Sequence, residues 1–333
     1  MSTLLLHSVS YAGLWGQAYL SVDDVVAKAR ELGFGGVMLM AKRPHVSILD
    51  YGQRERDALR SRLDQHGMRD LCIAGYCNLT ADLEHGDIPQ REMQVHYIVE
   101  LARLARDLGG NLVRVFTGYE NPSFDLTRQW RLIVDSLREA SRRAADLGVT
   151  IGVQNHHDIG VGYESLFDLI GAVREPNCRA LFDAWAPALQ GEDLGLAAQR
   201  LAPLTAHTTV ADYQLRPRYK YQSNLVNYEA QTPYAQAVPM GEGFIDYPAF
   251  FKALRAGGFK RSIAYEMCSP LLHGGDIETL DRYARKFLEY VKQADFAPTC
   301  VRVSIRASTP CDMLRKFCPG VRGRNETPHR ETG

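Results

Sequence analysis

The chain has 333 residues, of which 45% are hydrophobic and 23% charged, as in an ordinary globular protein. Its 39 basic and 39 acidic residues give zero formal net charge, which argues against nucleic-acid binding or binding to an anionic membrane surface. No run of about 18 apolar residues is present, so we expect no transmembrane helix, and the first residues do not resemble a signal peptide. Seven cysteines without a Cys-x-x-Cys pair indicate reduced thiols and a cytoplasmic location.

One pattern recurs along the chain: a charged amphipathic segment ends in glycine, and an apolar run follows. It occurs as AKARELGFGGVMLMA at 27–41 and as RRAADLGVTIGVQNHHD at 142–158, among other places. Helices commonly end at a glycine in the left-handed conformation, so each occurrence predicts a helix, its cap and then a strand. Strands that alternate with helices predict parallel strands joined by crossover helices.

Eight strands are expected in this way. They cover residues 3–9, 35–41, 70–76, 111–117, 149–155, 178–184, 204–210 and 261–267. Helices are expected at 90–108, 125–147, 246–257 and 276–294, and Ser21 with Asp24 predicts a capping box for an earlier helix. Eight βα units in about 295 residues predict an α/β fold, the closed (β/α)₈ TIM barrel. A doubly wound open sheet with an extra lobe is the alternative.

Two regions do not fit the repeat. Residues 214–245 form a long, tyrosine-containing insertion after the seventh strand, and we expect an ordered lid or interface loop there. Residues 296–333 are basic and lack apolar periodicity, so we expect a disordered tail beyond a catalytic barrel domain at 1–295.

Polar side chains stand at the expected carboxyl ends of four successive strands, which is where such a barrel carries its site. They are Gln154, Asp183, His207 and Glu266. This mixed set of nitrogen and oxygen ligands predicts one divalent metal ion, Mn²⁺ first, with Mg²⁺, Co²⁺ or Zn²⁺ as alternatives. Side chains in a strand alternate, so we expect His156 to point to the same side as Gln154 and His157 to point away.

Residues 3–294 resemble the xylose-isomerase-like TIM barrels, the sugar isomerase/epimerase superfamily. The motifs that carry the resemblance are GVQNHHD, ALFDAW, AHTTVADY, and GEGFIDYPAFFKALRAGGF followed by AYEM. The resemblance implies a divalent metal held by Glu, Asp, His and Glu, with two glutamates moving protons on carbons beside a sugar carbonyl. This sequence departs from the pattern at Gln154, which replaces the first Glu, at Ala186, where a His is usual, and at Thr209, where a ligand is usual.

The change at Gln154 has chemical consequences. An amide oxygen can ligate a hard cation, but it carries no charge and accepts no proton at neutral pH. The two-glutamate proton relay therefore lacks one member. The remaining catalytic candidates are Glu266, His156 and His157, and a single base suits proton abstraction followed by β-elimination.

Two further motifs, SVSYAGLWGQ and GVMLMAKRPH, resemble the catalytic subunit of bacterial C-glycoside deglycosidases. That resemblance implies a lyase that cleaves 3-oxo-glycosides by removing the C2 proton, and that works with a small second subunit. The candidate substrate-binding residues in this reading are Lys42, His45, Tyr11, Trp15 and Asn78. Packing or solvent-exposed roles are the alternatives for these residues, and His7 is expected to be a hydrogen-bonded barrel histidine.

Three other functions remain to be weighed against the lyase. The first is a keto-sugar isomerase or epimerase that uses the same enolate. The second is a non-catalytic barrel subunit of a hetero-complex. The third, an endonuclease-IV-like DNA-repair enzyme, is disfavoured because it needs several metal ions and a basic DNA-binding face. We expect a sugar or glycoside substrate and a homo- or hetero-oligomer.

Overall fold

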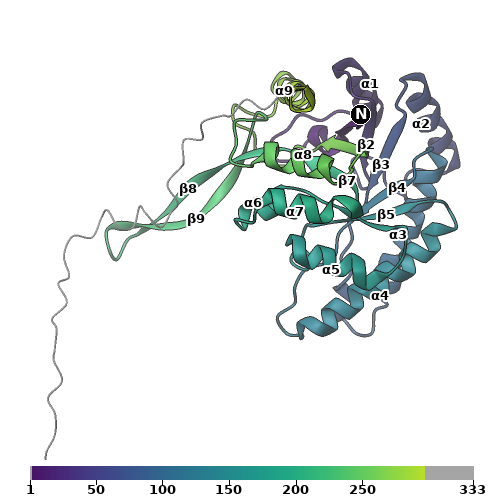
Figure 1. Ribbon diagram of the computed structural model, residues 1–333, viewed down its shortest axis with the longest axis horizontal. Helices are drawn as coiled ribbons and strands as arrows, with labels where there is room; N and C mark the ends of the chain where they lie inside the picture. Colours follow the sequence, from purple (N-terminus) through teal and green to yellow (C-terminus); the bar gives the residue numbers. More distant parts are fainter. Residues whose placement is uncertain (1, 297–333) are drawn as a thin grey trace, which may run out of the picture. The chain divides into compact units, whose positions relative to one another are not determined.

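The computed structural model describes residues 2–296, and within them eight parallel strands close into a barrel surrounded by helices (Figure 1). The strands are β1 (Leu4–His7), β2 (Gly36–Met40), β3 (Asp70–Ala74), β4 (Leu112–Val115), β5 (Thr150–Gln154), β6 (Cys178–Leu181), β7 (Thr205–Val210) and β10 (Ser262–Tyr265). Around the barrel their order is β1-β10-β7-β6-β5-β4-β3-β2. The predicted (β/α)₈ fold is therefore confirmed, and the open-sheet alternative is wrong.

The helices follow the strands as the glycine pattern predicts. They are α1 (Val22–Leu32), α2 (Gln53–Gln65), α3 (Gln90–Asp107), α4 (Leu126–Ala145), α5 (Tyr163–Val173), α6 (Trp185–Leu189), α7 (Leu194–Leu201), α8 (Tyr247–Ala256) and α9 (Ile277–Phe296), with 3₁₀ turns η1 (Ser8–Tyr11), η2 (Ala81–Leu83) and η3 (Ala202–Leu204). Helix α1 shows both predicted signals. The Ser21 Oγ accepts a hydrogen bond from the Asp24 N–H at 3.2 Å, and Gly33 ends the helix at a φ of 94°.

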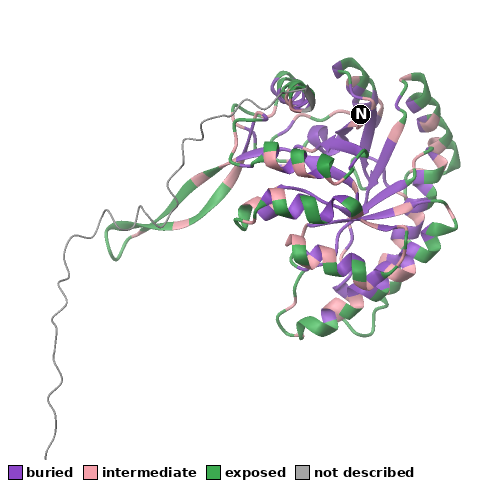
Figure 2. Ribbon diagram, in the orientation of Figure 1, coloured by how far each residue is buried: buried purple, intermediate pink, exposed green. Residues whose placement is uncertain are grey.

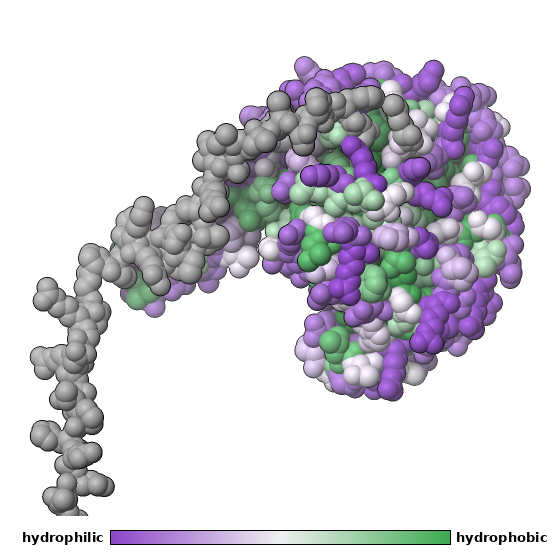
Figure 3. Space-filling view, in the orientation of Figure 1, coloured by the Kyte–Doolittle hydropathy of each residue, from purple (hydrophilic) through white to green (hydrophobic). Residues whose placement is uncertain are grey.

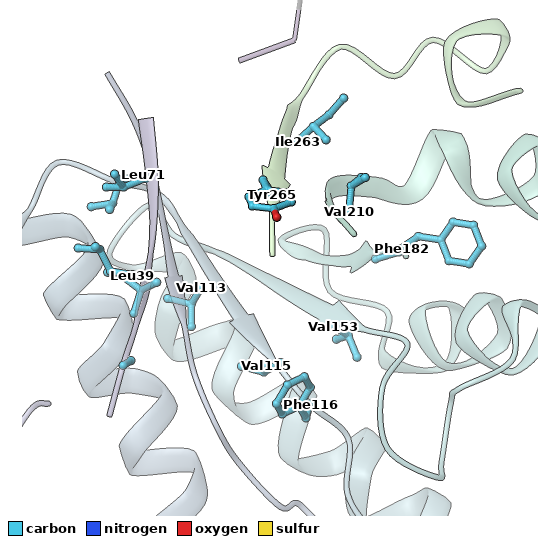
Figure 4. Packing of buried hydrophobic residues seen from close by; sticks show 14 of the residues in the cluster. Leu39, Leu71, Val113, Val115, Phe116, Val153, Phe182, Val210, Ile263 and Tyr265 are labelled. Carbon is cyan, nitrogen blue, oxygen red and sulfur yellow. The ribbon is translucent and has the colours of Figure 1, made fainter. Parts of the chain in front are cut away.

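Strand alternation divides the core into an outer and an inner part. Outward-facing residues such as Val113, Val115 and Val153 belong to the large hydrophobic cluster between strands and helices, part of which Figure 4 shows. Inward-facing residues such as Leu112 form a separate, smaller cluster inside the barrel. In Figure 2 the barrel strands are largely buried, while the helices around them bury mainly the side that faces the strands. The face seen in Figure 3 is mainly hydrophilic, with smaller hydrophobic areas between.

The insertion after β7 is a hairpin, which corrects the predicted loop. Strands β8 (Asp212–Gln222) and β9 (Asn227–Val238) pair in antiparallel fashion and extend from the barrel, exposed over most of their length (Figures 1 and 2). The Asp212 carboxylate anchors the base by accepting hydrogen bonds from the N–H groups of Gly241 and Gly243, each at 2.9 Å. A Cβ at position 243 would overlap this carboxylate, which explains the glycine.

The predicted tail, residues 296–333, lies outside the described residues except for Phe296, which ends α9. In the described part of the chain no helix is long and apolar enough to cross a membrane. Cys72, Cys77 and Cys178 are free and buried, and Cys268 is free and partly buried. These observations leave the cytoplasmic location a prediction.

Candidate active site

A small cavity lies at the carboxyl ends of β5, β6, β7 and β10. Its polar and aromatic lining consists of Gln154, His156, Asp183, Trp185, Thr209, Tyr213, Tyr247, Glu266 and Cys268. The cavity volume is about 30 Å³, which is room for about one water molecule. A sugar would therefore have to displace side chains at the barrel mouth in order to bind. Three of the four predicted ligands and one predicted catalytic histidine lie together here.

Gln154, Asp183 and Thr209 form one hydrogen-bonded group. The Gln154 Nε2 donates to Asp183 Oδ2 and to Thr209 Oγ1, the latter at 3.2 Å. Thr209 donates to both Asp183 oxygens, from its Oγ1 at 2.6 Å and from its backbone N–H at 2.8 Å. Both oxygens of this carboxylate are therefore engaged within the protein.

Burial and the Glu266 charge raise the pKa of Asp183 to about 7, although its hydrogen bonds favour the charged form. Asp183 is thus a carboxyl group that exchanges its proton near neutral pH. The same burial lowers the pKa of His156 to about 3, with His157 and Arg114 adding to the effect. His156 is consequently neutral at physiological pH.

Glu266 follows β10 and is the less buried of the two carboxylates in the cavity, with a side chain 13% exposed. Its neighbour is His7, whose Nε2 lies 3.6 Å from Glu266 Oε1. The Val9 N–H donates to His7 Nδ1 at 3.1 Å, and burial holds the pKa of His7 well below its usual value. The neutral ring therefore carries its proton on Nε2, which lies near Glu266 but has no hydrogen-bond partner among the described residues. His7 is therefore a neutral neighbour of this carboxylate.

Arg114 on β4 is the residue that sequence reasoning missed. Its side chain is 1% exposed, and its Nη1 donates to Gln154 Oε1 at 2.9 Å. Its guanidinium carbon lies 4.1 Å from the Phe116 ring centroid and 4.8 Å from that of Tyr76. The signal was present in the sequence, because Leu112-Val113-Arg114-Val115 places one charged residue inside an otherwise apolar strand. Alternation puts Arg114 on the same side as Leu112, inside the barrel.

Trp185 and Tyr213 form the aromatic wall of the cavity. Their rings are stacked, with centroids 4.6 Å apart and an interplanar angle of 24°. The Trp185 Nε1 is buried and has no hydrogen-bond partner among the described residues. A ring of this kind can pack against the apolar face of a sugar while its N–H donates to a hydroxyl.

Two of the predicted histidines lie away from this cavity. His207 points inside the barrel, where its Nδ1 is 2.9 Å from Ser262 Oγ, and burial lowers its pKa to about 3. His157 has a φ of 65° and packs between Phe116 and Tyr119, with both centroid distances 4.4 Å. Their proposed roles as ligand and base remain predictions, and neither ring forms a hydrogen bond with a carboxylate of the cavity in the described residues.

The five candidate substrate-binding residues do not line the cavity either. The Tyr11 hydroxyl donates to Asp281 at 2.8 Å, and both ring nitrogens of His45 have partners, Ser8 Oγ at 3.0 Å and the Leu20 carbonyl at 3.1 Å. The other three are Lys42, whose Nζ lies 4.1 Å from the Tyr76 ring centroid, Asn78, which accepts from Thr80, and Trp15, which is 47% exposed. Their contact with substrate stays a prediction.

The arrangement of these residues does not fit the expected divalent ion. The Gln154 amide oxygen accepts a hydrogen bond from the Arg114 guanidinium. A metal ion bound to the same oxygen would lie close to this positive charge. Both Asp183 oxygens accept internal hydrogen bonds. His207 does not line the cavity: its Nδ1 faces Ser262, and its Nε2 has no hydrogen-bond partner among the described residues. Within residues 2–296 no group of three or more His, Cys, Asp or Glu side chains could hold a metal ion. Among the described residues, the only carboxyl groups that line the cavity are those of Asp183 and Glu266.

Comparisons with known proteins identify the family. The chain resembles the structure of D-psicose 3-epimerase with D-tagatose from Clostridium cellulolyticum H10, with a TM-score of 0.70 and 15% identity over 88% of this chain and 99% of that one. An L-ribulose 3-epimerase structure gives a TM-score of 0.66 and 18% identity over 88% and 94%. A probable 3-DHS dehydratase involved in petrobactin synthesis from Bacillus anthracis gives a TM-score of 0.63 and 19% identity over 87% and 99%.

At these identities the structural similarity shows the fold alone. No curated protein sequence matches the chain. The family described as "Xylose isomerase-like TIM barrel", however, matches residues 26–292, which is most of the sequence. The chain therefore belongs to the xylose isomerase-like TIM barrel family.

Proposed function

We propose that this protein is a carbohydrate enzyme that moves a proton on the carbon beside the carbonyl group of a keto-sugar, as an isomerase or epimerase does. The observation that carries the proposal is the pair of Glu266 and Asp183 in one cavity. Glu266 is partly exposed and has the neutral His7 beside it, so we assign it as the base. Asp183, with a pKa of about 7, is the group that can return a proton at neutral pH.

The comparisons support this reaction class more than the lyase that we expected from the sequence. Structures with the same fold include epimerases named for D-psicose and L-ribulose, which are keto-sugars. The stacked Trp185 and Tyr213 supply a surface suited to a sugar ring. Substrate identity, a second subunit, the oligomeric state and the cytoplasmic location remain parts of the proposal.

Cleavage of a 3-oxo-glycoside is the second candidate, because one observation favours it. Gln154 accepts a hydrogen bond from Arg114 and has no carboxylate, so β5 supplies no second base opposite Glu266. A single base that removes the C2 proton would be followed by loss of the aglycone from C1. The fold also occurs in a protein described as a probable dehydratase.

Exchange of carbon-bound hydrogen tests both candidates. The protein is incubated in D₂O with D-psicose, D-tagatose, D-fructose and L-ribulose, and deuterium incorporation beside the carbonyl is followed by NMR. The substitution Glu266→Gln should slow exchange by roughly 10²–10⁴-fold, since it removes the general base. Glu242→Gln is the matched control, because Glu242 is exposed at the base of the hairpin and should leave exchange unchanged.

Product analysis then separates the two reactions. Interconversion of free keto-sugars supports the isomerase or epimerase, whereas release of an aglycone from a 3-oxo-glucoside without such interconversion supports the lyase. Absence of both exchange and release, with chelated and metal-supplemented protein alike, would refute the proposed enzyme and favour a non-catalytic barrel.

A further inference from the structure

Arg114 is a buried cation with unused hydrogen-bond donors. Its side chain is 1% exposed, its Nη1 donates to the Gln154 amide oxygen, and the guanidinium also interacts with the Tyr76 side chain. Nε and Nη2 are buried without a hydrogen-bond partner among the described residues. Buried donors are nearly always satisfied in folded proteins, so two adjacent free ones on a charged group indicate that something binds there.

The two free nitrogens share one edge of the guanidinium group. This edge donates two parallel hydrogen bonds and recognises two neighbouring oxygens in one plane. Arg43 of the same chain shows the geometry, because its Nε and Nη2 donate to the two Asp50 oxygens at 2.7 and 2.5 Å. The corresponding edge of Arg114 is available for a ligand with the same arrangement of oxygens.

No neighbouring carboxylate neutralises the charge of Arg114. No carboxylate lies within ion-pair distance of Arg114 in the described part of the chain, while Phe116 and Tyr76 pack against its guanidinium. Its charge acts on neutral groups from other strands, among them His7 and His207, and on the Glu266 carboxylate. A buried charge without an ion-pair partner is costly for folding, so its retention calls for a role in binding or catalysis.

Gln154 connects Arg114 to the cavity. Its side chain lines the cavity with Glu266, and its amide oxygen accepts from Arg114 Nη1. Its Nε2 donates to Asp183, so the orientation of the amide is fixed from both ends. A glutamine with this orientation holds a guanidinium in place, which is a different task from holding a metal ion.

We infer that Arg114 is the built-in cation of this site, and that its free edge binds the two vicinal oxygens of an α-hydroxy ketone. The inference rests on the proposed function and specifies its substrate class. As the C–H bond beside the carbonyl breaks, its proton passes to Glu266, and the electron pair forms the C=C bond of an enediolate. The oxygen that gains negative charge is held by Arg114 N–H groups, and return of the proton to carbon completes the transfer.

In this mechanism Arg114, rather than a divalent ion, stabilises the negative charge that develops on the substrate oxygen. A guanidinium fixed by Gln154 offers two directed donors to the developing oxyanion at no cost in reorganisation. Thr209 also fits this view, because its hydroxyl donates to Asp183 and leaves that carboxylate satisfied without a metal.

Binding of oxalate tests the inference without relying on turnover. Oxalate is a planar dianion with adjacent oxygens, like an enediolate, and its affinity is measured by calorimetry on the full-length, chelator-treated protein. We expect binding that Mn²⁺ does not tighten. Arg114→Met and Arg114→Lys should weaken it roughly 10- to 100-fold, since both lose the two-donor edge and Lys keeps only the charge. Arg43→Met, which removes an exposed arginine of the same type, should bind as the wild type does.

Three results would overturn the inference: no oxalate binding by the wild type, binding that appears only with Mn²⁺, or wild-type affinity in the folded Arg114→Met and Arg114→Lys variants. If circular dichroism shows that neither variant folds, the Mn²⁺ comparison on the wild type decides alone. Failure of the proposed function is seen separately, as the absence of hydrogen exchange with keto-sugars while the oxalate results hold.

Discussion

The substitution Gln154→Glu changes one atom at the centre of the hydrogen-bonded group and tests its geometry. In the wild type, Gln154 accepts from Arg114 Nη1 at 2.9 Å and donates through Nε2 to Asp183 Oδ2. A glutamate would keep the acceptor for Arg114 and gain a charge-assisted hydrogen bond. Its second oxygen, however, would replace the donor and face the Asp183 carboxylate directly. The two acids would then have to share one proton.

The cost of this contact should depend on pH. Below about pH 7 Asp183 holds a proton in the folded wild type, and the variant pair holds one as well, so the loss of stability should be small. Above about pH 7 the wild-type Asp183 releases its proton, whereas the variant pair retains the shared one. The unfolded chain binds neither proton there, so the variant should lose about 1.4 kcal/mol of stability per pH unit relative to the wild type. By about pH 9 the difference reaches roughly 3 kcal/mol.

Urea unfolding at about pH 6 and about pH 9 measures the effect, with Gln53→Glu as the matched control. Gln53 on α2 also donates through Nε2 to an aspartate, Asp57 Oδ1 at 2.9 Å, but in an exposed position. Solvent screening should keep the control within about 0.5 kcal/mol of the wild type at both pH values. The hydrogen-bonding scheme of the site is refuted if Gln154→Glu has the same cost at both pH values or behaves like the control.

Three further predictions concern stability. Burial lowers the pKa of His156 and His207 to about 3, so stability should be lost as pH falls below about 6.5. These two histidines alone contribute about 2.7 kcal/mol per pH unit, the lowered pKa values of His7 and His157 act in the same direction, and the raised pKa of Asp183 offsets about 1.4 kcal/mol per pH unit. Thermal unfolding between about pH 6.5 and pH 4.5 measures this slope, and His207→Asn should reduce it; an unchanged slope would contradict the burial of the neutral ring. Ser21→Ala should cost about 1 kcal/mol in urea unfolding through loss of the α1 cap, and no measurable loss would refute that role. Gly243→Ala should lower the free energy of unfolding by at least about 2 kcal/mol, because the new Cβ displaces the Asp212 carboxylate. Gly171→Ala is the control, since α5 has open space around this position and alanine should stabilise the helix slightly. Similar effects of both substitutions would contradict the role of Asp212 in anchoring the hairpin.

The sequence by itself determined the architecture of the barrel. The helix, glycine and strand pattern placed eight strands and their helices close to their positions, because local periodicity and caps such as Ser21 and Gly33 act within a few residues of the chain. The same reasoning brought Gln154, Asp183 and Glu266 together, since parallel strands in a barrel end on one side.

The hairpin after β7 could not be predicted in the same way. Its strands contain Pro217 and Pro233, which interrupt a strand pattern, and the register shifts between Arg216 and Arg218. Proline is tolerated here because a two-stranded ribbon has open edges that need no further donor. The pairing depends on contacts between segments and on the Asp212 anchor rather than on local periodicity.

Only the tertiary structure decided the chemistry of the site. Arg114 is forty residues from Gln154 in sequence; the pairing of β4 with β5 brings its guanidinium to the Gln154 amide, and closure of the barrel brings it within electrostatic range of Glu266. The role of His7 depends equally on the pairing of β1 with β10, which sets its Nε2 beside Glu266. Periodicity shows that a side chain points inward, but which polar atoms meet inside a barrel depends on register and closure, and these follow from the packing of the whole chain.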